Sequence, residues 1–292
     1  MKFIQKIFYI LIRLFFLLIL LYFISNKEYF YSSFKNTIIL WFNYCLPPIS
    51  ISYIISVFLS DFPFISKLLY PLLKPVFNFE NEKSCSIYLI SILVGNPTSS
   101  KLIIQAVDNK QISVDEGNRL LCFSSFISTI FLYSILNFNL FIIIFIIELL
   151  ISIIISNVKT KNTKQYIIIE SKNNTILDTY FNIINNLPSL LLSILFSMII
   201  TNLFSSLITN TYLKSLFELT IGIKILTYNI NIINLIFIFI LIFSHGLAIT
   251  LQIYWIIKKS NLSFNNFIKY RLLSIFLSLI SLIIIYLFVF FL

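Results

Sequence analysis

Long apolar runs separated by short polar segments dominate the chain. About 20 apolar residues are enough for a helix to cross the ~30 Å hydrocarbon core of a bilayer. The strict alternation typical of membrane β-strands is not present in these runs. The pattern therefore predicts an all-α polytopic membrane protein with about six transmembrane helices. The predicted spans are residues 3–25, 37–60, 113–136, 140–157, 176–209 and 271–292.

Two further apolar segments are interrupted by glycine. In the first, a short helix over residues 85–95 is followed by "NPTSSK" and then by a second short helix in "LIIQAVDNK". The second is the run 231–257, which contains "SHGLAITLQ". Irregular backbone at membrane depth is tolerated only where it lines a cavity or is buried in protein. Both segments are therefore predicted to be broken helices, either re-entrant or spanning.

Proline and capping residues predict further local features. The pair Pro47-Pro48 removes two backbone donors and is expected to kink or break the span over 37–60. The three prolines of residues 62–79 favour a helix in the membrane interface or a broken segment. Ser113 and Glu116 form a capping box at the start of the span over 113–136.

Basic residues predict the topology. Lysines before the first span, together with the basic stretch 158–175, place the N-terminus and that loop in the cytoplasm. The first span lacks a cleavage site of the A-x-A type, so it is predicted to be an anchor rather than a signal peptide. The predicted units are an anchor and loop (1–36), a first half (37–157), a cytoplasmic basic loop (158–175) and a second half (176–292).

The two halves are loosely similar in order. Each has a proline-bearing span, a short mixed segment and a glycine-broken apolar run, followed by an arginine before Leu-Leu, at Arg119 and at Arg271. Paired, interrupted hydrophobic segments in corresponding halves are typical of transporter binding sites. The order predicts a loose internal repeat.

Composition excludes several classes. The chain is 59% hydrophobic and 11% charged, with a formal charge of +10. Lysines facing anionic headgroups account for that charge, and no basic-aromatic patch outside the membrane runs indicates nucleic acid. The bilayer is therefore the expected partner. Cys45, Cys85 and Cys122 are predicted to be buried thiols.

No catalytic pattern is found in the sequence. One histidine cannot supply a metal cluster, and motifs of hydrolases, zinc proteases and P-loop enzymes are missing. The expectation is a protein that is not an enzyme and that has no cofactor and no metal.

The order "PLLKPVFNF", "LVGNPTSSKLI", "ISVDEGNRLLCFSS", then "LFELTIGIKIL", "FSHGLAITLQI", "FIKYRLL", resembles the nucleoside-recognition (Gate) domain family over roughly residues 37–280. The likeness is closest to the branch named for the sporulation integral membrane protein YlbJ. The residues that match the family pattern are Gly95, Pro97, Lys101, Glu116, Arg119, Leu120, Leu121, Gly246, Leu247 and Gln252. The chain departs from the pattern at Ser99, His245 and Thr250, and it lacks the proline that usually follows the Arg-Leu-Leu helix start.

The resemblance implies a role in sporulation, in the plasma membrane or in the membrane around the forespore. It also implies a small polar, nucleoside-like solute. Sporulation membrane proteins, or further copies of the chain, are the partners that it suggests.

Two interpretations of the first break remain open. Asn96, Thr98, Ser99 and Ser100 could cap the helix that follows a simple turn. Alternatively, the free N–H groups and partial positive charge of a half-helix N-terminus, with Lys101 beside it, suit an anionic or hydroxyl-rich solute.

Other polar residues in apolar surroundings complete the candidate set. His245 is the single histidine, and Gln252 seven residues later is expected to share its helical face. Glu148 and Glu218 are expected to be paired or to face a cavity, with Arg119 or Arg271 as partner. The candidate solute or gate residues are Gly95, Asn96, Pro97, Thr98, Ser99, Ser100, Lys101, His245, Gly246 and Gln252. The candidate charge-pairing residues are Glu116, Arg119, Glu148, Glu218 and Arg271.

These patterns lead to two hypotheses. The first is a permease or gate for a small polar solute, and the second is a membrane assembly factor for spore formation that transports nothing. A polar cavity joining the two breaks favours the first hypothesis, and a packed, dry centre favours the second.

Overall fold

The computed structural model describes residues 17, 21–61, 64–158, 176–258 and 260–291, and every regular element within these ranges is a helix. The predicted all-α class is confirmed for this part of the chain. Residues 1–16, 18–20 and 159–175 lie outside it, and they include most of the predicted first span and nearly all of the basic loop. The division into an anchor, two halves and a loop stays a prediction.

The first long helical element joins three segments. These are α2 (Lys27–Leu40), the π-helix η1 (Trp41–Cys45) and α3 (Leu46–Asp61). The paired prolines do not break the element. The chain instead forms a π-helical turn just before them, in which the Leu46 N–H donates to the Trp41 carbonyl. This wider turn rearranges the hydrogen bonds where proline supplies no donor.

Shorter helices follow in the first half. They are α4 (Phe64–Phe77), α5 (Glu82–Val94), α6 (Thr98–Asp108), α7 (Val114–Phe123), α8 (Thr129–Ile135) and α9 (Phe138–Ser156). The proline-rich segment is thus a continuous helix, α4. The break between α5 and α6 lies where glycine and proline predicted it.

The second half has the same mixture of long and short helices. They are α10 (Ile176–Ser205), α11 (Thr211–Ser215), α12 (Leu219–Thr227), α13 (Ile232–Ser244), α14 (Gly246–Ile257) and α15 (Phe264–Phe291). The second predicted break is confirmed at His245, where α13 ends and α14 begins.

Five helical segments of the described chain are long and apolar enough to cross a membrane. They are Lys27–Leu59, Phe138–Ser156, Ile183–Ser205, Ile232–Ile257 and Phe264–Leu287. The predicted single span over 113–136 is wrong, because the helix ends at Phe123 and resumes only at Thr129. The hydroxyls of Ser124 and Ser125 donate to the carbonyls of Leu120 and Leu121. These side-chain hydrogen bonds satisfy helix carbonyls and favour the end of the helix at this point.

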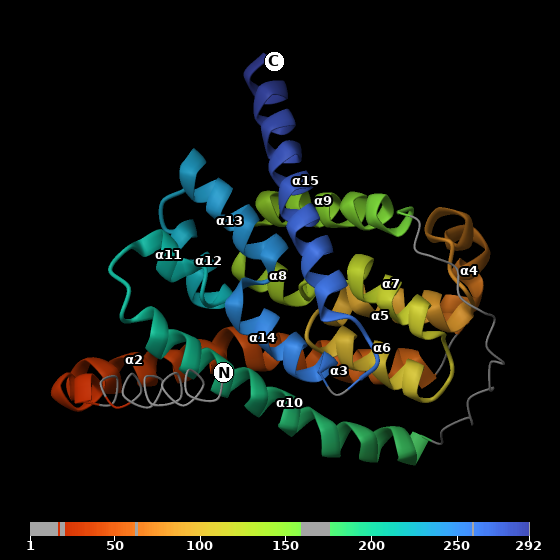
Figure 1. Cartoon of the computed structure of the whole chain (residues 1–292), viewed down its shortest axis with the longest axis horizontal. Coiled ribbons are helices and arrows are strands. Elements are labelled where there is room, and N and C mark those ends of the chain that lie inside the picture. Colours follow the sequence, from red (N-terminus) through yellow and green to blue (C-terminus); the bar gives the residue numbers. More distant parts are fainter. Residues whose placement is uncertain (1–16, 18–20, 62–63, 159–175, 259, 292) are drawn as a thin grey trace, which may run out of the picture.

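The helices pack so that the two breaks and the gap between α7 and α8 meet. Helix α10 lies along α2 and α3, α13 packs on α15, and α5 contacts both α3 and α4 (Figure 1). Contacts of α6 with α14 bring the first break close to the second. The core includes Phe239 and Phe267, both fully buried.

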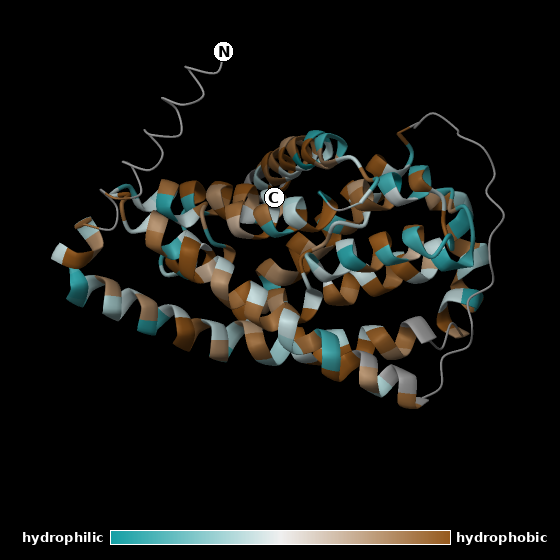
Figure 2. Ribbon diagram, turned by 60° about the horizontal axis from the view of Figure 1, so that its bottom comes forward, coloured by the Kyte–Doolittle hydropathy of each residue, from teal (hydrophilic) through white to brown (hydrophobic). Residues whose placement is uncertain are grey.

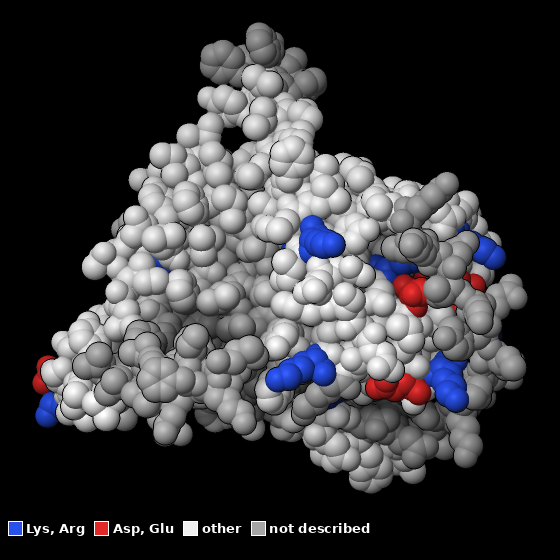
Figure 3. All heavy atoms as spheres, in the orientation of Figure 1, with Lys and Arg blue, Asp and Glu red and all other residues white. Residues whose placement is uncertain are grey.

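The outer surface is mostly apolar. Apolar residues run along most helices, and hydrophilic ones lie largely at helix ends and in connections (Figure 2). On the face shown in Figure 3, charged side chains are sparse and lie mainly over its right-hand half. The C-terminal part of α15 projects from the body with Ile283 and Ile284 exposed (Figure 1). Exposed apolar surface of this extent is typical of a protein embedded in lipid.

Candidate functional site

Gly95 ends α5 in a backbone conformation that other residues rarely adopt. Its φ is +67° and its ψ is −176°, a region open essentially to glycine alone. A Cβ atom at this position would lie 2.6 Å from the carbonyl carbon of Ile127 and would also collide with the backbone nitrogen of Ser128. The glycine therefore permits both the turn and the close approach of the segment that precedes α8.

Asn96 holds the first break together. Its Oδ1 accepts hydrogen bonds from the hydroxyls of Ser99, at 2.8 Å, and Ser100, at 2.6 Å. Its Nδ2 donates to the Ser125 hydroxyl at 2.8 Å, and its backbone N–H donates to the Phe126 carbonyl at 2.8 Å. Both serine hydroxyls are thus satisfied inside the protein, while Thr98 and Pro97 face a cavity.

The segment Ser124–Ser128 is a third interruption, which the sequence analysis missed. It joins α7 to α8, and Ser128 caps α8 by accepting from the Phe131 N–H. The Ser128 hydroxyl also donates to the Leu93 carbonyl near the end of α5 at 2.8 Å. The pair Ser124-Ser125 followed by a capping serine was the available signal, because serines favour caps and turns over helix interiors.

The second break is tighter than the first. His245 has a left-handed conformation, with φ +68°, and Gly246 follows with φ +63°. The N–H groups of Leu247 and Ala248 at the start of α14 donate to the carbonyls of Leu216 and Phe217. These amides are already occupied, so the start of α14 does not present free donors there.

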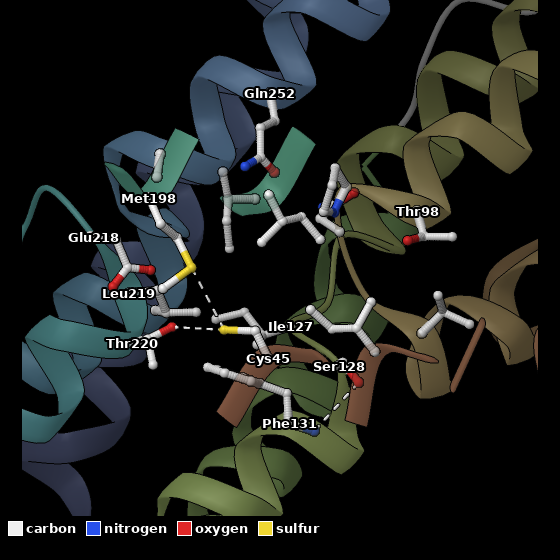
Figure 4. A pocket seen from close by; sticks show the side chains of 17 residues that line it. Cys45, Thr98, Ile127, Ser128, Phe131, Met198, Glu218, Leu219, Thr220 and Gln252 are labelled. Atoms are coloured by element: carbon white, nitrogen blue, oxygen red, sulfur yellow. Dashed lines mark hydrogen bonds between the residues drawn. The ribbon is translucent and has the colours of Figure 1, made fainter. Parts of the chain in front are cut away.

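A cavity of about 50 Å³ lies where the three interruptions approach α10 and η1. We call it the central cavity, and Figure 4 shows the side chains around it. At roughly 10–15 Å³ for each water molecule, it has room for a few waters. Its lining residues are Cys45, Ile49, Val94, Asn96, Pro97, Thr98, Ile127, Ser128, Phe131, Ile194, Met198, Glu218, Leu219, Thr220, Ala248, Ile249 and Gln252.

Several lining residues were not predicted. The Cys45 thiol lies 3.7 Å from the Met198 sulfur and 3.4 Å from the Thr220 hydroxyl (Figure 4). Cys45 lies on the π-helix and Met198 on α10, so these contacts join segments far apart in the sequence. No sequence pattern pairs them.

Glu218 is the one lining residue that carries a formal charge among those described. Its side chain is the N-cap of α12, where Oε2 accepts from the Ile221 N–H at 2.6 Å. Burial raises the pKa of its carboxyl, and hydrogen bonds from Ile221 and Thr220 act in the opposite direction. The lining thus contains an acidic side chain and, among the described residues, no basic one.

Lys101 and His245 do not line the central cavity. Lys101 extends toward α10, where its Nζ lies 3.4 Å from Asn186 Oδ1, and burial lowers its pKa. His245 directly precedes α14 in a left-handed conformation and is not in the cavity lining, whereas Gln252 on α14 is, so the expected shared helical face is wrong. The left-handed turn at His245 reorients the chain between the two residues.

His245 instead contacts Arg271. The Arg271 Nη1 lies 3.2 Å from His245 Nε2 and donates to the Ser125 carbonyl at 3.0 Å, while Nη2 donates to the Cys122 carbonyl at 2.9 Å. Arg271 and Glu148 both line a second cavity of about 10 Å³, without a direct ion pair between them. This buried cluster ties α15 and α13 to the segment after α7.

Arg119 and Glu116 pair with each other near the start of α7. Arg119 Nη1 lies 2.7 Å from Glu116 Oε2, and the guanidinium also donates to the Phe77 and Asn78 carbonyls after α4. Burial raises the pKa of the Glu116 carboxyl, and the neighbouring Arg119 partly offsets this effect. The predicted cap is present, since the Ser113 hydroxyl accepts from the Glu116 N–H.

The reciprocal bond of the capping box comes from another residue. The Ser113 N–H donates to Glu80 Oε2, whereas Glu116 Oε1 accepts from the Glu80 N–H. The three cysteines are free and buried, as predicted. Within the described ranges, no three His, Cys, Asp or Glu side chains gather as metal ligands would.

In the part of the chain that the structure describes, every regular element is a helix, and its five long apolar helices are consistent with a multi-pass membrane protein. Comparison of the chain with protein-family models, with curated proteins and with solved structures finds no match. The geometry of the central cavity and the sequence resemblance are therefore what a functional proposal rests on.

Proposed function

We propose that the protein is a membrane permease or gate for a small polar solute, and that the central cavity is where the solute passes or binds. The observation that carries this proposal is the composition of the lining. Both predicted breaks contribute to it, through Pro97 and Thr98 on one side and Ala248 and Gln252 on the other. Interrupted helices that meet at one site are typical of transporters, and Thr98, Glu218 and Gln252 supply polar groups to this mainly apolar lining.

The resemblance to the Gate family extends the proposal. It supports action in sporulation, in the plasma membrane or the forespore membrane, with a nucleoside-like solute as one candidate. The cavity of about 50 Å³ is smaller than a nucleoside, so passage of such a solute requires the helices around the breaks to move apart.

A solute-flux assay tests the proposal. The full chain is reconstituted in liposomes, which are mixed with hyperosmotic glycerol, ribose, uridine or ethylammonium chloride, and reswelling is followed by light scattering. Ala248 is 2% exposed and lines the cavity, so Ala248→Leu should block it by adding three carbon atoms. Leu247→Ala, at an exposed neighbouring position, is the matched control.

We expect at least one solute to enter faster than it enters protein-free liposomes, with the excess lost in Ala248→Leu and kept in Leu247→Ala. Equal rates with and without protein for every solute would contradict the proposal.

A second candidate is a membrane assembly factor for spore formation. The small cavity and the internally satisfied serine hydroxyls of the first break favour it. The two candidates differ in what a blocked cavity does. In a spore-forming host that lacks its own copy, Ala248→Leu should restore spore yield if the protein only assembles other components. It should fail to do so if solute passage is required.

A further inference from the structure

Gln252 presents an unused hydrogen-bond acceptor at the central cavity. The single hydroxyl proton of Ser197 is donated to the Ile194 carbonyl at 2.8 Å. Gln252 places Nε2 toward the Ser197 hydroxyl, to which it donates. Gln252 Oε1 is buried and has no hydrogen-bond partner. A buried acceptor left in this state is unfavourable unless a donor arrives.

Glu218 adds a carboxyl group to the same lining, at 5% exposure. Helix capping alone does not explain a carboxylate at this position, because neutral side chains cap helices equally well. The other N-caps at which the structure shows a side-chain bond to the helix start include Asn81, Ser113, Ser128, Asn137, Asn210, Asn231 and Ser263, all of them neutral. The acidic cap is thus found at the cavity and at none of these seven helix starts.

The rest of the lining is mainly apolar. Ile49, Ile127, Phe131, Ile194 and Ile249 form much of the wall. A bare metal ion needs a cage of several oxygen ligands, which this wall does not supply. An ammonium group on a short alkyl chain brings N–H donors for the acceptors and apolar surface for the wall.

We propose that the central cavity recognises a small primary alkylammonium solute, with Glu218 as its counter-charge and Gln252 Oε1 as an acceptor for one N–H. The proposal names a solute class for the proposed gate and rests on that function. It replaces the expectation of an anionic solute, because Lys101 lies outside the lining and no lysine, arginine or histidine of the described chain is part of it. A cavity of about 50 Å³ suits a solute of the size of ethylammonium.

Thermal unfolding of the purified full chain in detergent micelles tests the assignment. Ethylammonium chloride, potassium chloride, sodium propionate and uridine are titrated separately, at matched ionic strength for the salts. A solute that binds the native state raises Tm as its concentration exceeds Kd. The variants are Glu218→Gln, which keeps an oxygen for the Ile221 N–H, and Glu28→Gln on the outer surface as the charge control.

We expect ethylammonium to raise Tm in the native chain and in Glu28→Gln, with no shift from potassium or propionate. Glu218→Gln should need at least a tenfold higher concentration for the same shift. If that variant does not fold, Gln252→Leu takes its place. The order of the Tm shifts that the solutes give in the native chain also tests the assignment without any variant. A shift of equal size with potassium, or one that survives in Glu218→Gln, would overturn the assignment.

The two proposals fail differently. If uridine or propionate raises Tm and ethylammonium does not, the gate stands and the ammonium assignment is wrong. If ethylammonium binds but no solute crosses the liposome membrane, the assignment stands as a binding site and the gate is wrong.

Discussion

Gly95 should tolerate alanine far less well than Gly246, although both have positive φ. At Gly95 the backbone conformation excludes other residues, which costs about 1–3 kcal/mol for alanine. The added methyl group also meets the backbone of Ile127 and Ser128 rather than flexible side chains. Overpacking of this kind costs roughly 1–3 kcal/mol more. The total expected loss of unfolding free energy for Gly95→Ala is therefore about 2–6 kcal/mol.

Gly246 provides the matched comparison. Its φ is +63°, but the nearest atom to an added Cβ is a side-chain carbon, Leu241 Cδ1, at 3.3 Å. Alanine there should cost only the left-handed conformation, roughly 1–2 kcal/mol. The smaller entropy of the unfolded chain, a gain of about 0.4–1 kcal/mol, is common to both substitutions and cancels between them.

Reversible unfolding in mixed micelles with increasing dodecyl sulfate measures both losses, with helix content followed by circular dichroism. We expect the loss for Gly95→Ala to exceed that for Gly246→Ala by about 1–3 kcal/mol. Equal losses would refute the reasoning, because they would mean that the segment before α8 moves away from α5 at little cost.

Three further predictions concern buried groups. Arg271→Leu should cost about 2–4 kcal/mol of unfolding free energy, because two buried carbonyls lose a charged donor. Lys269→Leu, at an exposed position on the same helix, should change the unfolding free energy by less than ~0.5 kcal/mol. Similar losses for the two variants would contradict the buried network. Arg119→Met should lower the unfolding free energy by about 3 kcal/mol at pH 8, because it leaves the buried Glu116 carboxylate without its partner. The loss should be smaller at pH 5, because the pKa of Glu116 is raised and protonation neutralises the unpaired carboxylate. Unfolding measured at both pH values tests this, and an equal loss at the two would refute it. The three cysteines should resist maleimide in the folded protein and react after denaturation. Tyr228→Cys, at a position that is 94% exposed, is the positive control for labelling of the folded protein. Rapid labelling of the native chain would contradict the burial of its cysteines.

Much of the secondary structure could be predicted from the sequence because its causes are local. The break at Gly95, the turn before Phe138 and the cap at Ser113 each depend on residues within a few positions. The prediction failed over 113–136, where apolar composition suggested a continuous span. There the serine hydroxyls and the close approach of the Gly95 turn favour an interruption, and the second of these influences is not local.

The candidate site was predicted less completely. Gln252 and Thr98 were among the proposed gate residues and line the central cavity, whereas Lys101 and His245 were proposed and lie outside its lining. Glu218 was expected only to pair or to face a cavity, and the structure places it in the lining. A helical spacing of seven residues relates two side chains only while the helix is continuous, and the turn at His245 removes that relation.

The sequence by itself determined the all-α class of the described chain, most of its helical segments and the two positions where glycine interrupts an apolar run, because hydrophobic periodicity and backbone sterics act along neighbouring residues. Only the tertiary structure decided which polar groups share a cavity. Cys45, Thr98, Glu218 and Gln252 come from four separate helical regions, and they meet because those helices bury apolar surface against one another. Burial of that kind is nondirectional, so it leaves no spacing in the sequence from which the pairing could be derived.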